Sequence, residues 1–320
     1  MKTEKLRISS DPKILILIPC HNESISIPLT IKRCFGNIPD AEIVVIDNAS
    51  SDDTAEVAER HGVRVINEPN QGKGFAVRRG FSELKSHHEA ILMIDGDDTY
   101  GLESFVEGLK LIGQGHDMVI GRRVKFHEDE LETGGGGHYR RGHQLGNAAF
   151  SRLFKLFFGI QITDPLSGWR LMNPKFVKSF SHTNGGFEIE TELNAHAFLL
   201  KSAIKEIEVK YFSRVEGSNS KLSTYRDGLK ILRRNLKLFR SEKPATAFSI
   251  LALPWLILSS VIITQGIVGY WQTDLVPKFP RLVAAFTLFI VSSLLWVTGM
   301  ILDRIRLNRE ILVRYEYSRK

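Results

Sequence analysis

AILMIDGDDTY, residues 90–100, joins a continuous apolar run to three aspartates within four positions. The apolar part, residues 90–94, has the length and composition of a strand that is buried on both faces. Asp95, Asp97 and Asp98 follow, and carboxylates this close repel one another unless a cation lies among them. Hard oxygen ligands suit Mg²⁺ or Mn²⁺, and ligands of open α/β sheets bind at the carboxyl ends of strands. Alone, the stretch could equally be a solvated acidic turn.

Around this stretch, buried strands alternate with helices. The alternation predicts βαβ units with right-handed crossovers and a mostly parallel sheet. The polar residues that end the first, second and fourth strands should then meet in one crevice, as a nucleotide site requires. Strands are expected at residues 13–18, 42–46, 63–66, 91–94, 118–120 and 204–212, helices at residues 24–35, 54–60, 72–84, 102–112 and 187–200, and a loop at residues 164–170.

Phosphate-binding fingerprints of other folds are missing. The sequence has neither GxxxxGK[ST] nor a GxGxxG after its first strand. The fragment Gly-Lys-Gly at residues 72–74 has two interpretations. It either simply begins a helix, or it brings the backbone close to a diphosphate with Lys73 as the counter-charge. Glu188, Glu190 and Glu192 are interpreted as helix-start charges on a solvated face.

The net charge of +7 favours anionic partners, namely nucleic acid, phosphorylated substrates or a lipid surface. The basic residues cluster beside the hydrophobic runs rather than on a stacking platform, which disfavours nucleic acid. Two cysteines, Cys20 and Cys34, are typical of a reduced compartment without a disulfide framework.

Two uncharged runs near the C-terminus, residues 245–271 and 282–302, predict membrane spans. As helices they would extend about 40 Å and about 31 Å, enough to cross a hydrocarbon layer of roughly 30 Å. Six Lys or Arg lie from Lys230 to Lys243 and six from Arg304 onward, but the connecting segment holds only two. The positive-inside rule therefore predicts a multi-pass protein of the cytoplasmic membrane, with the first 244 residues and the C-terminal tail in the cytoplasm.

Two amphipathic helices are expected beside these spans. Residues 144–158 either pack on the sheet or lie in the membrane interface. Residues 224–240 pair an apolar face with a basic one, which is typical of binding to anionic lipid. The expected divisions are residues 1–222 for the catalytic domain, 223–244 for a basic juxtamembrane helix, 245–302 for the two spans and 303–320 for a basic tail.

An ordered set of motifs links the strand ends. The motifs are Pro19-x-His21-Asn22-Glu23, Asp47-Asn48-x-Ser50-x-Asp52, Asn70-x-Gly72-Lys73-Gly74, Asp95-x-Asp97, Gly121-x-Arg123 and Ser167-Gly-x-Arg170. In this order they resemble family 2 glycosyltransferases of the α/β GT-A fold, in particular the branch of the dolichyl-phosphate mannose synthases and polyprenyl-phosphate glucosyltransferases. The resemblance covers residues 13–240 well and the spans by pattern.

The resemblance implies that a hexose moves, with inversion, from a nucleotide sugar (UDP-glucose or GDP-mannose) to an undecaprenyl or dolichyl phosphate. It implies that Asp97, with Asp95, holds Mg²⁺ or Mn²⁺, and that Asp97, Arg123, Arg214 and Lys221 carry the catalysis. Residues implied around the nucleotide sugar are Pro19, His21, Glu23, Asp47, Lys73 and Asp95. Residues implied around the acceptor phosphate are Arg123, Arg170, Arg214, Ser220 and Lys221.

No general base is required by this reaction, because a phosphate monoester with a second pKa near ~6 is largely dianionic at neutral pH and is itself the nucleophile. Thr99 stands where the mannose synthases commonly have Gln, which leaves a third metal ligand open. The Gln-x-x-Arg-Trp mark of processive synthases is missing, so polymerisation is disfavoured. Another lipid-linked acceptor, a non-catalytic nucleotide-sugar sensor and homo-oligomerisation stay open as alternatives.

Overall fold

The computed structural model describes residues 13–125, 162–180, 189–215, 239–241, 243–273, 275 and 279–319. The chain divides into two compact units, Met1–Leu222 with Val313–Lys320, and Ser223–Leu312. The amphipathic segment predicted at residues 144–158, and all but the last two residues of the one at 224–240, lie outside the described residues.

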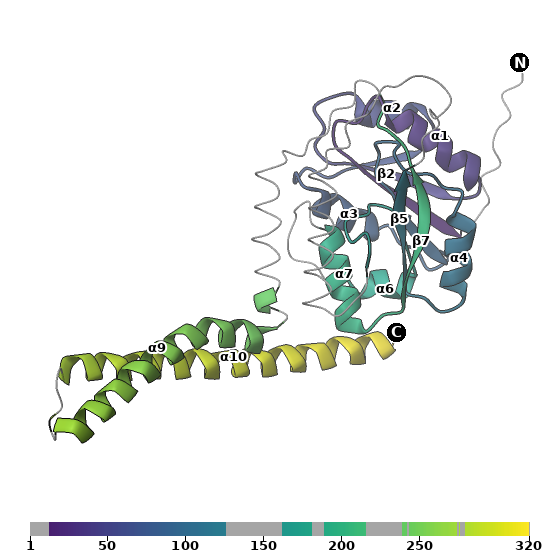
Figure 1. Ribbon diagram of the computed structural model, residues 1–320. Helices are drawn as coiled ribbons and strands as arrows, with labels where there is room; N and C mark the ends of the chain where they lie inside the picture. Colours follow the sequence, from purple (N-terminus) through teal and green to yellow (C-terminus); the bar gives the residue numbers. More distant parts are fainter. Residues whose placement is uncertain are drawn as a thin grey trace, which may run out of the picture. The chain divides into compact units, whose positions relative to one another are not determined.

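A seven-stranded sheet in the order β3-β2-β1-β4-β6-β5-β7 forms the centre of the first unit (Figure 1). Strands β1, β2, β3 and β4 pair in parallel, and so do β5 and β7. The prediction of a mostly parallel α/β sheet is therefore confirmed. The strands are β1 (Ile14–Cys20), β2 (Glu42–Asp47), β3 (Arg64–Asn67), β4 (Ala90–Met93), β5 (Met118–Lys125), β6 (Arg170–Met172) and β7 (Ile204–Tyr211).

Strand β6 departs from the sequence-based prediction, which ended a loop at residue 170 and placed no strand after it. It lies between β4 and β5 and is antiparallel to both. Its three residues are fully buried. A strand this short carries no alternating pattern that could have indicated it.

Helices cover both faces of the sheet, with α1 and α4 on one side and α3 and α7 on the other (Figure 1). Helix α1 begins three residues later than predicted, at Ile27, since Pro28 occupies its first turn, where a missing N–H costs nothing. The short α6 was not predicted; Asn173 caps it by accepting from Phe176 N at 2.6 Å. The helices of this unit are α1 (Ile27–Asn37), α2 (Thr54–Arg60), α3 (Lys73–Phe81), α4 (Phe105–Gly113), α6 (Pro174–Ser179) and α7 (Ile189–Leu200).

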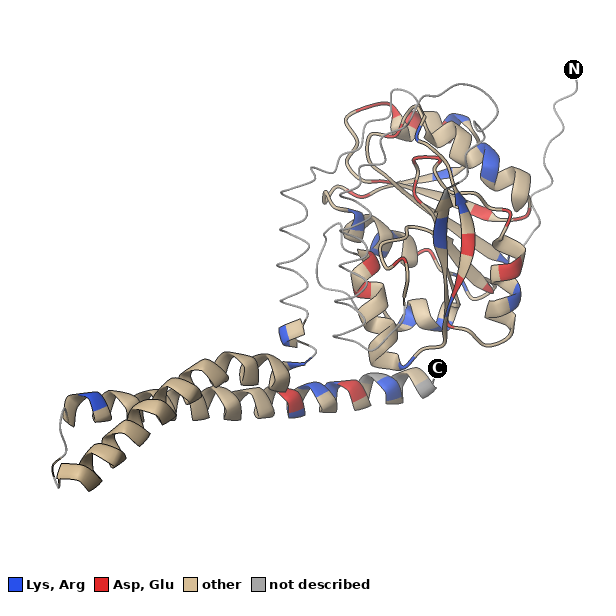
Figure 2. Cartoon of the chain, in the orientation of Figure 1, with Lys and Arg blue, Asp and Glu red and all other residues tan. Residues whose placement is uncertain are grey.

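The second unit contains the helix α9 (Pro244–Thr273) and most of α10 (Phe279–Arg319). Both are long and apolar enough to cross a membrane, and Figure 2 shows long stretches of each without charge. Small residues let the two helices approach: Ser292 donates to the Ala252 carbonyl at 3.0 Å, and a Cβ on Gly299 would meet Phe248 Cβ at 2.7 Å. Close packing at small residues is the usual way in which membrane helices associate.

Candidate active site

The parallel strands β1, β2 and β4 end at the same edge of the sheet. Cys20, the last residue of β1, lies opposite Asp47, the last residue of β2, and Leu17 of β1 lies opposite Met93, the last residue of β4. Asp95 and Asp97 come two and four residues after the end of β4. The polar residues after these strands therefore share one edge, where ligands of α/β sheets bind.

Asp97 is the most enclosed carboxylate of the acidic stretch, with 5% of the residue exposed. Its Oδ1 accepts from Thr99 N at 3.3 Å and from Thr99 Oγ1 at 2.6 Å, and its Oδ2 lies 2.6 Å from Arg214 Nη2. Burial, and secondly the charge of Asp95, raise the pKa of Asp97. A buried carboxylate with a second one nearby fits a site for a hard divalent ion, and Arg214 supplies the positive charge beside Asp97 in this structure. Through these two hydrogen bonds Thr99 fixes the orientation of the Asp97 carboxylate.

Lys73, the first residue of α3, joins Asp95 to a residue that the sequence analysis did not place in the site. Its Nζ lies 2.5 Å from Asp95 Oδ1 and 2.5 Å from Glu190 Oε1. Burial lowers the pKa of Lys73, but the two carboxylates outweigh it and the net direction is upward. Two close carboxylates therefore keep this buried amine charged.

Glu190 was interpreted as a solvated helix-start charge, and that interpretation is wrong. The residue is only 5% exposed. The available signal was the rest of α7, since residues 193–200 contain no Asp, Glu, Lys or Arg. A helix without charge over two turns is buried on most sides, and a glutamate in such a helix needs a partner.

Asn48 holds the turn in front of Lys73. Its side-chain amide donates to the carbonyls of Glu68 and Asn70 at 3.1 and 2.7 Å and accepts from Gly72 N at 2.6 Å. Gly72 has φ +141°, which few side chains tolerate. Asn48, the residue after β2, thus fixes the position of the Gly-Lys-Gly fragment.

Four further residues at this edge were predicted to bind the nucleotide sugar. Asp47 is 6% exposed, and its Oδ1 is buried without a hydrogen-bond partner among the described residues. His21 contacts the Asn48 carbonyl through Nδ1 at 2.9 Å, so Nδ1 carries the proton and Nε2 accepts from the Gln71 amide at 3.1 Å. Pro19 lies in β1 and is half-buried, and Glu23 accepts from Ser26 Oγ at 2.8 Å.

Arg123 on β5 is held by Asp164. Its Nε and Nη2 lie 2.7 Å from the two carboxylate oxygens, and its backbone N donates to Oδ2 at 3.2 Å. The guanidinium carbon also lies 5.4 Å from the ring centre of Tyr211. A bidentate pair of this kind fixes the plane of the guanidinium as well as its position.

Arg170 is fully buried in β6. Its guanidinium donates to the carbonyls of Ser167 and Pro165 at 3.1 and 2.8 Å and to Asn194 Oδ1 at 2.6 Å. These contacts tie the turn before β6 to α7 and leave no exposed face for a lipid phosphate. Ser220 and Lys221, also predicted at the acceptor phosphate, lie outside the described residues.

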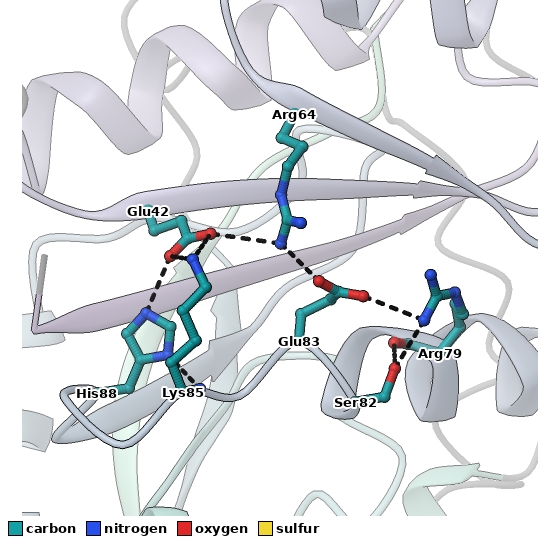
Figure 3. Close-up of polar contacts among 7 residues, drawn as sticks. All are labelled: Glu42, Arg64, Arg79, Ser82, Glu83, Lys85 and His88. Atoms are coloured by element: carbon teal, nitrogen blue, oxygen red, sulfur yellow. Dashed lines mark hydrogen bonds and ion pairs between the residues drawn. The ribbon is translucent and has the colours of Figure 1, made fainter.

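A second group that could hold a metal lies at the other edge of the sheet. Glu42, His87 and His88 place ligand atoms within 4.8 Å of one another. Glu42 begins β2, whereas Asp47 ends it, so the group lies about 17 Å from the strand ends of the candidate active site at 3.3 Å per residue. Lys85 contacts both Glu42 oxygens at 3.0 Å, and His88 Nε2 contacts one at 3.1 Å (Figure 3).

His88 is poorly prepared to bind a metal in this group. Its Nδ1 accepts from Lys85 N at 3.1 Å, so Nε2, which faces Glu42, carries the ring proton. A metal there would have to displace that proton and compete with Lys85 and Arg64 for Glu42. We therefore interpret the group as an ion-pair network that fixes the starts of β2 and β4.

The family model described as glycosyl transferase family 2 matches residues 15–179. The chain belongs to this family. Glycosyltransferase AglJ of Haloferax volcanii is 32% identical over 72% of this chain and 72% of its own length. The dolichyl-phosphate hexose transferase of the same organism is 30% identical over 63% of this chain and 83% of its own length. The family predicted from the ordered motifs is thus confirmed.

Solved structures agree on the fold of this family 2 glycosyltransferase. Glucosyl-3-phosphoglycerate synthase from Mycobacterium tuberculosis, in complex with Mn²⁺ and UDP-glucose, is 21% identical and covers 70% of this chain and 79% of that chain, with a TM-score of 0.53. At this identity the likeness confirms the GT-A fold. It also shows that a protein with this fold carries Mn²⁺ with a nucleotide sugar.

Proposed function

We propose that this glycosyltransferase transfers a hexose, with inversion, from UDP-glucose or GDP-mannose to a polyprenyl phosphate at the cytoplasmic face of a membrane. The observation that carries the proposal is Asp97, a buried carboxylate beside Asp95 against which the cation of Arg214 lies, on a chain with two candidate membrane spans. The name of its dolichyl-phosphate hexose transferase relative supports the same acceptor class.

On the donor side, Asp97 with Asp95 would hold Mg²⁺ or Mn²⁺. When bound, such an ion offsets the charge that develops on the leaving nucleoside diphosphate. Lys73 supplies a further positive charge close to Asp95. The Oδ1 of Asp47, which has no hydrogen-bond partner among the described residues, would accept from an N–H or O–H of the nucleoside. His21, Glu23 and Pro19 would line the same nucleoside site. Both a uracil and a guanine offer such donors, so the sugar nucleotide stays open.

On the acceptor side, Arg123, Arg214 and, by family resemblance, Ser220 and Lys221 would bind the lipid phosphate. Arg123 is set in one plane by Asp164, which suits bidentate contact with a phosphate. The dianionic phosphate attacks the anomeric carbon directly, so no side chain has to remove a proton. Catalysis then consists of positioning and electrostatic stabilisation. Arg170 is left out of this proposal because its guanidinium is fully occupied inside the fold.

The membrane arrangement follows from charge. Twelve Lys or Arg flank the spans on the side of the catalytic domain and the C-terminus, six in residues 230–243 and six in residues 304–320. The positive-inside rule therefore favours a cytoplasmic catalytic domain and tail. Nucleotide sugars and the phosphate end of the lipid would then meet on the same side of the bilayer.

The decisive experiment offers a panel of nucleotide sugars and undecaprenyl phosphate to the purified full-length protein, with and without Mn²⁺. We expect a hexosyl-phosphoryl lipid, identified by mass spectrometry, only with the metal. Asp97→Asn should lower transfer by about 100-fold or more, the scale of a lost electrostatic stabiliser. Asp98→Asn is the matched control, because Asp98 pairs instead with Arg33 on α1, at 2.9 and 3.0 Å.

Three results would redirect the assignment. Robust transfer by Asp97→Asn would contradict the role of that carboxylate. Transfer only to another lipid-linked molecule would favour the alternative acceptor. Metal-dependent binding of nucleotide sugar without turnover on any acceptor would favour a sensor.

A further inference from the structure

Arg214 occupies the side of Asp97 that a metal would use. Its Nη2 lies 2.6 Å from Asp97 Oδ2. The other oxygen, Oδ1, accepts two hydrogen bonds from Thr99, at 2.6 and 3.3 Å. The carboxylate therefore offers an incoming cation mainly the oxygen that the guanidinium already contacts.

Because the Asp97–Arg214 pair is partly buried, a second cation bound to Asp97 would be strongly repelled by Arg214. The Asp97 side chain is 7% exposed and that of Arg214 is 34% exposed, so water screens the pair only in part. A divalent ion sits about 2.0–2.6 Å from a carboxylate oxygen. Such an ion on Oδ2 would lie within a few ångströms of the guanidinium, and two cations at that separation repel each other strongly.

The backbone around Arg214 allows its side chain to leave without disturbing the sheet. Strand β7 ends at Tyr211, and Phe212 is still fixed, since its N donates to the Thr99 carbonyl at 2.8 Å and Arg33 lies 4.6 Å from its ring centre. Arg214 comes two residues after this last fixed point. Its long side chain can therefore swing while β7 and Thr99 stay in place.

We propose that Arg214 and the divalent cation compete for Asp97, so that binding of the metal with its nucleotide sugar releases Arg214 toward the acceptor phosphate. The inference rests on the proposed function, because it takes Asp97 as the metal ligand and Arg214 as a phosphate ligand. By linkage, whatever draws Arg214 away from Asp97 must also tighten the metal. Donor with metal and acceptor phosphate should thus each bind more tightly when the other is present.

The test measures Mn²⁺ affinity rather than turnover. Full-length protein in detergent is titrated with Mn²⁺, and the free ion is followed by electron paramagnetic resonance. We expect Arg214→Gln to bind Mn²⁺ about ten-fold more tightly than wild type, within the 5- to 150-fold range of typical coupling. Arg214→Lys, which keeps the charge, should lie between the two. Thermal unfolding of each variant confirms that it is folded.

Arg33→Gln is the matched control. It removes the same charge from an Arg–Asp pair one residue away, at Asp98, but leaves Asp97 untouched. Its Mn²⁺ affinity should therefore match that of wild type. Equal tightening in both variants would reduce the effect to general electrostatics and overturn the competition.

The remaining outcomes separate this inference from the proposed function. If Asp97→Asn loses Mn²⁺ while Arg214→Gln binds it no better than wild type, the competition is refuted and the metal site stands. If Mn²⁺ binding does not depend on Asp97 at all, the metal site proposed for the enzyme fails, and the competition fails with it.

Discussion

The Nζ of Lys73 lies 2.5 Å from Oε1 of Glu190, although 117 positions separate the two residues in the chain. This ion pair connects the first residue of α3 to the start of α7 across the candidate active site, and Asp95 shares the same amine. Removing the lysine would leave two neighbouring carboxylates without their common cation.

A double-mutant cycle tests this arrangement. Lys73→Met should lower the thermal midpoint, because uncompensated buried charges are strongly destabilising. The double variant Lys73→Met/Glu190→Gln should melt at a higher temperature than Lys73→Met alone, with a coupling of about 1–2 kcal/mol. Lys32→Met, at an exposed position of α1, should melt like wild type. Additive effects of Lys73→Met and Glu190→Gln would show that the two side chains do not interact in solution.

Arg123 should depend on Asp164 for acceptor binding. Asp164→Ala removes the bidentate partner and the acceptor of the Arg123 backbone N–H, so the guanidinium loses its fixed plane. We expect kcat/KM for the lipid phosphate to fall about 10- to 100-fold, or about 1.4–2.7 kcal/mol, while KM for the nucleotide sugar changes little. Steady-state kinetics with each substrate varied in turn gives both values.

Arg122 provides the comparison for that experiment. It is the neighbouring arginine on β5, points to the opposite face of the strand and pairs with Glu208. Arg122→Gln should leave both kinetic constants within about two-fold of wild type, since surface ion pairs contribute little. If Arg122→Gln lowered kcat/KM as much as Asp164→Ala does, any change of charge on β5 would be enough to lower activity, and no specific role of Arg123 would follow.

His196 should make the first unit sensitive to acid. It lies between the rings of Phe176 and Phe180, with Ser179 Oγ 2.9 Å from Nε2, and burial lowers its pKa to about 4. The unfolded chain, with a pKa near 6.5, binds the proton first as the pH falls. The stability contributed by neutral His196 is therefore complete above pH 6.5 and is lost toward pH 4.

The loss from this one residue amounts to about 3 kcal/mol at most, at 1.36 kcal/mol per pKa unit. His196→Gln cannot ionise, but its amide can still donate to Ser179. Thermal midpoints measured from pH 7 to pH 4.5 should consequently decline less steeply for the variant. Parallel curves for the two proteins would mean that His196 is hydrated in solution.

The network at Glu42 and His88 should stabilise the fold without serving the metal (Figure 3). His88→Ala removes hydrogen bonds to Lys85 N and Glu42. A loss of about 1–2 kcal/mol should lower the thermal midpoint by about 2–6 °C. The Mn²⁺ concentration for half-maximal transfer should not change. A shift in that concentration would move the metal, or a second metal, to this edge of the sheet.

Much of the fold follows from sequence because its strands are buried on both faces. Residues 43–46 and 91–94 are unbroken apolar runs, and the strands predicted at 42–46 and 91–94 match β2 and β4 within one residue. Strand β6 was not predicted. It is three residues long, and its pairing with β4 and β5 stabilises it rather than the intrinsic strand propensity of its residues. Local patterns cannot report such pairing.

The site shows a similar division. Asp97 and Lys73 could be chosen from motifs and Arg214 from the family resemblance, because each supplies a charge that the proposed chemistry needs. Glu190 and Arg170 could not be placed correctly, since their roles depend on burial. Charged residues are usually exposed, and only the packed structure reveals that Glu190 lies buried against Lys73 at the candidate site and that Arg170 holds the turn before β6.

The order of the proposed site residues along the chain has a consequence for how such enzymes diversify. Every residue proposed to contact the donor precedes Gly121, whereas Arg123, Asp164 and Arg214 follow it. The proposed nucleotide recognition is thus encoded by one continuous N-terminal part of the polypeptide. Replacing the later part by recombination could retarget the enzyme to a different lipid while its sugar supply stayed the same.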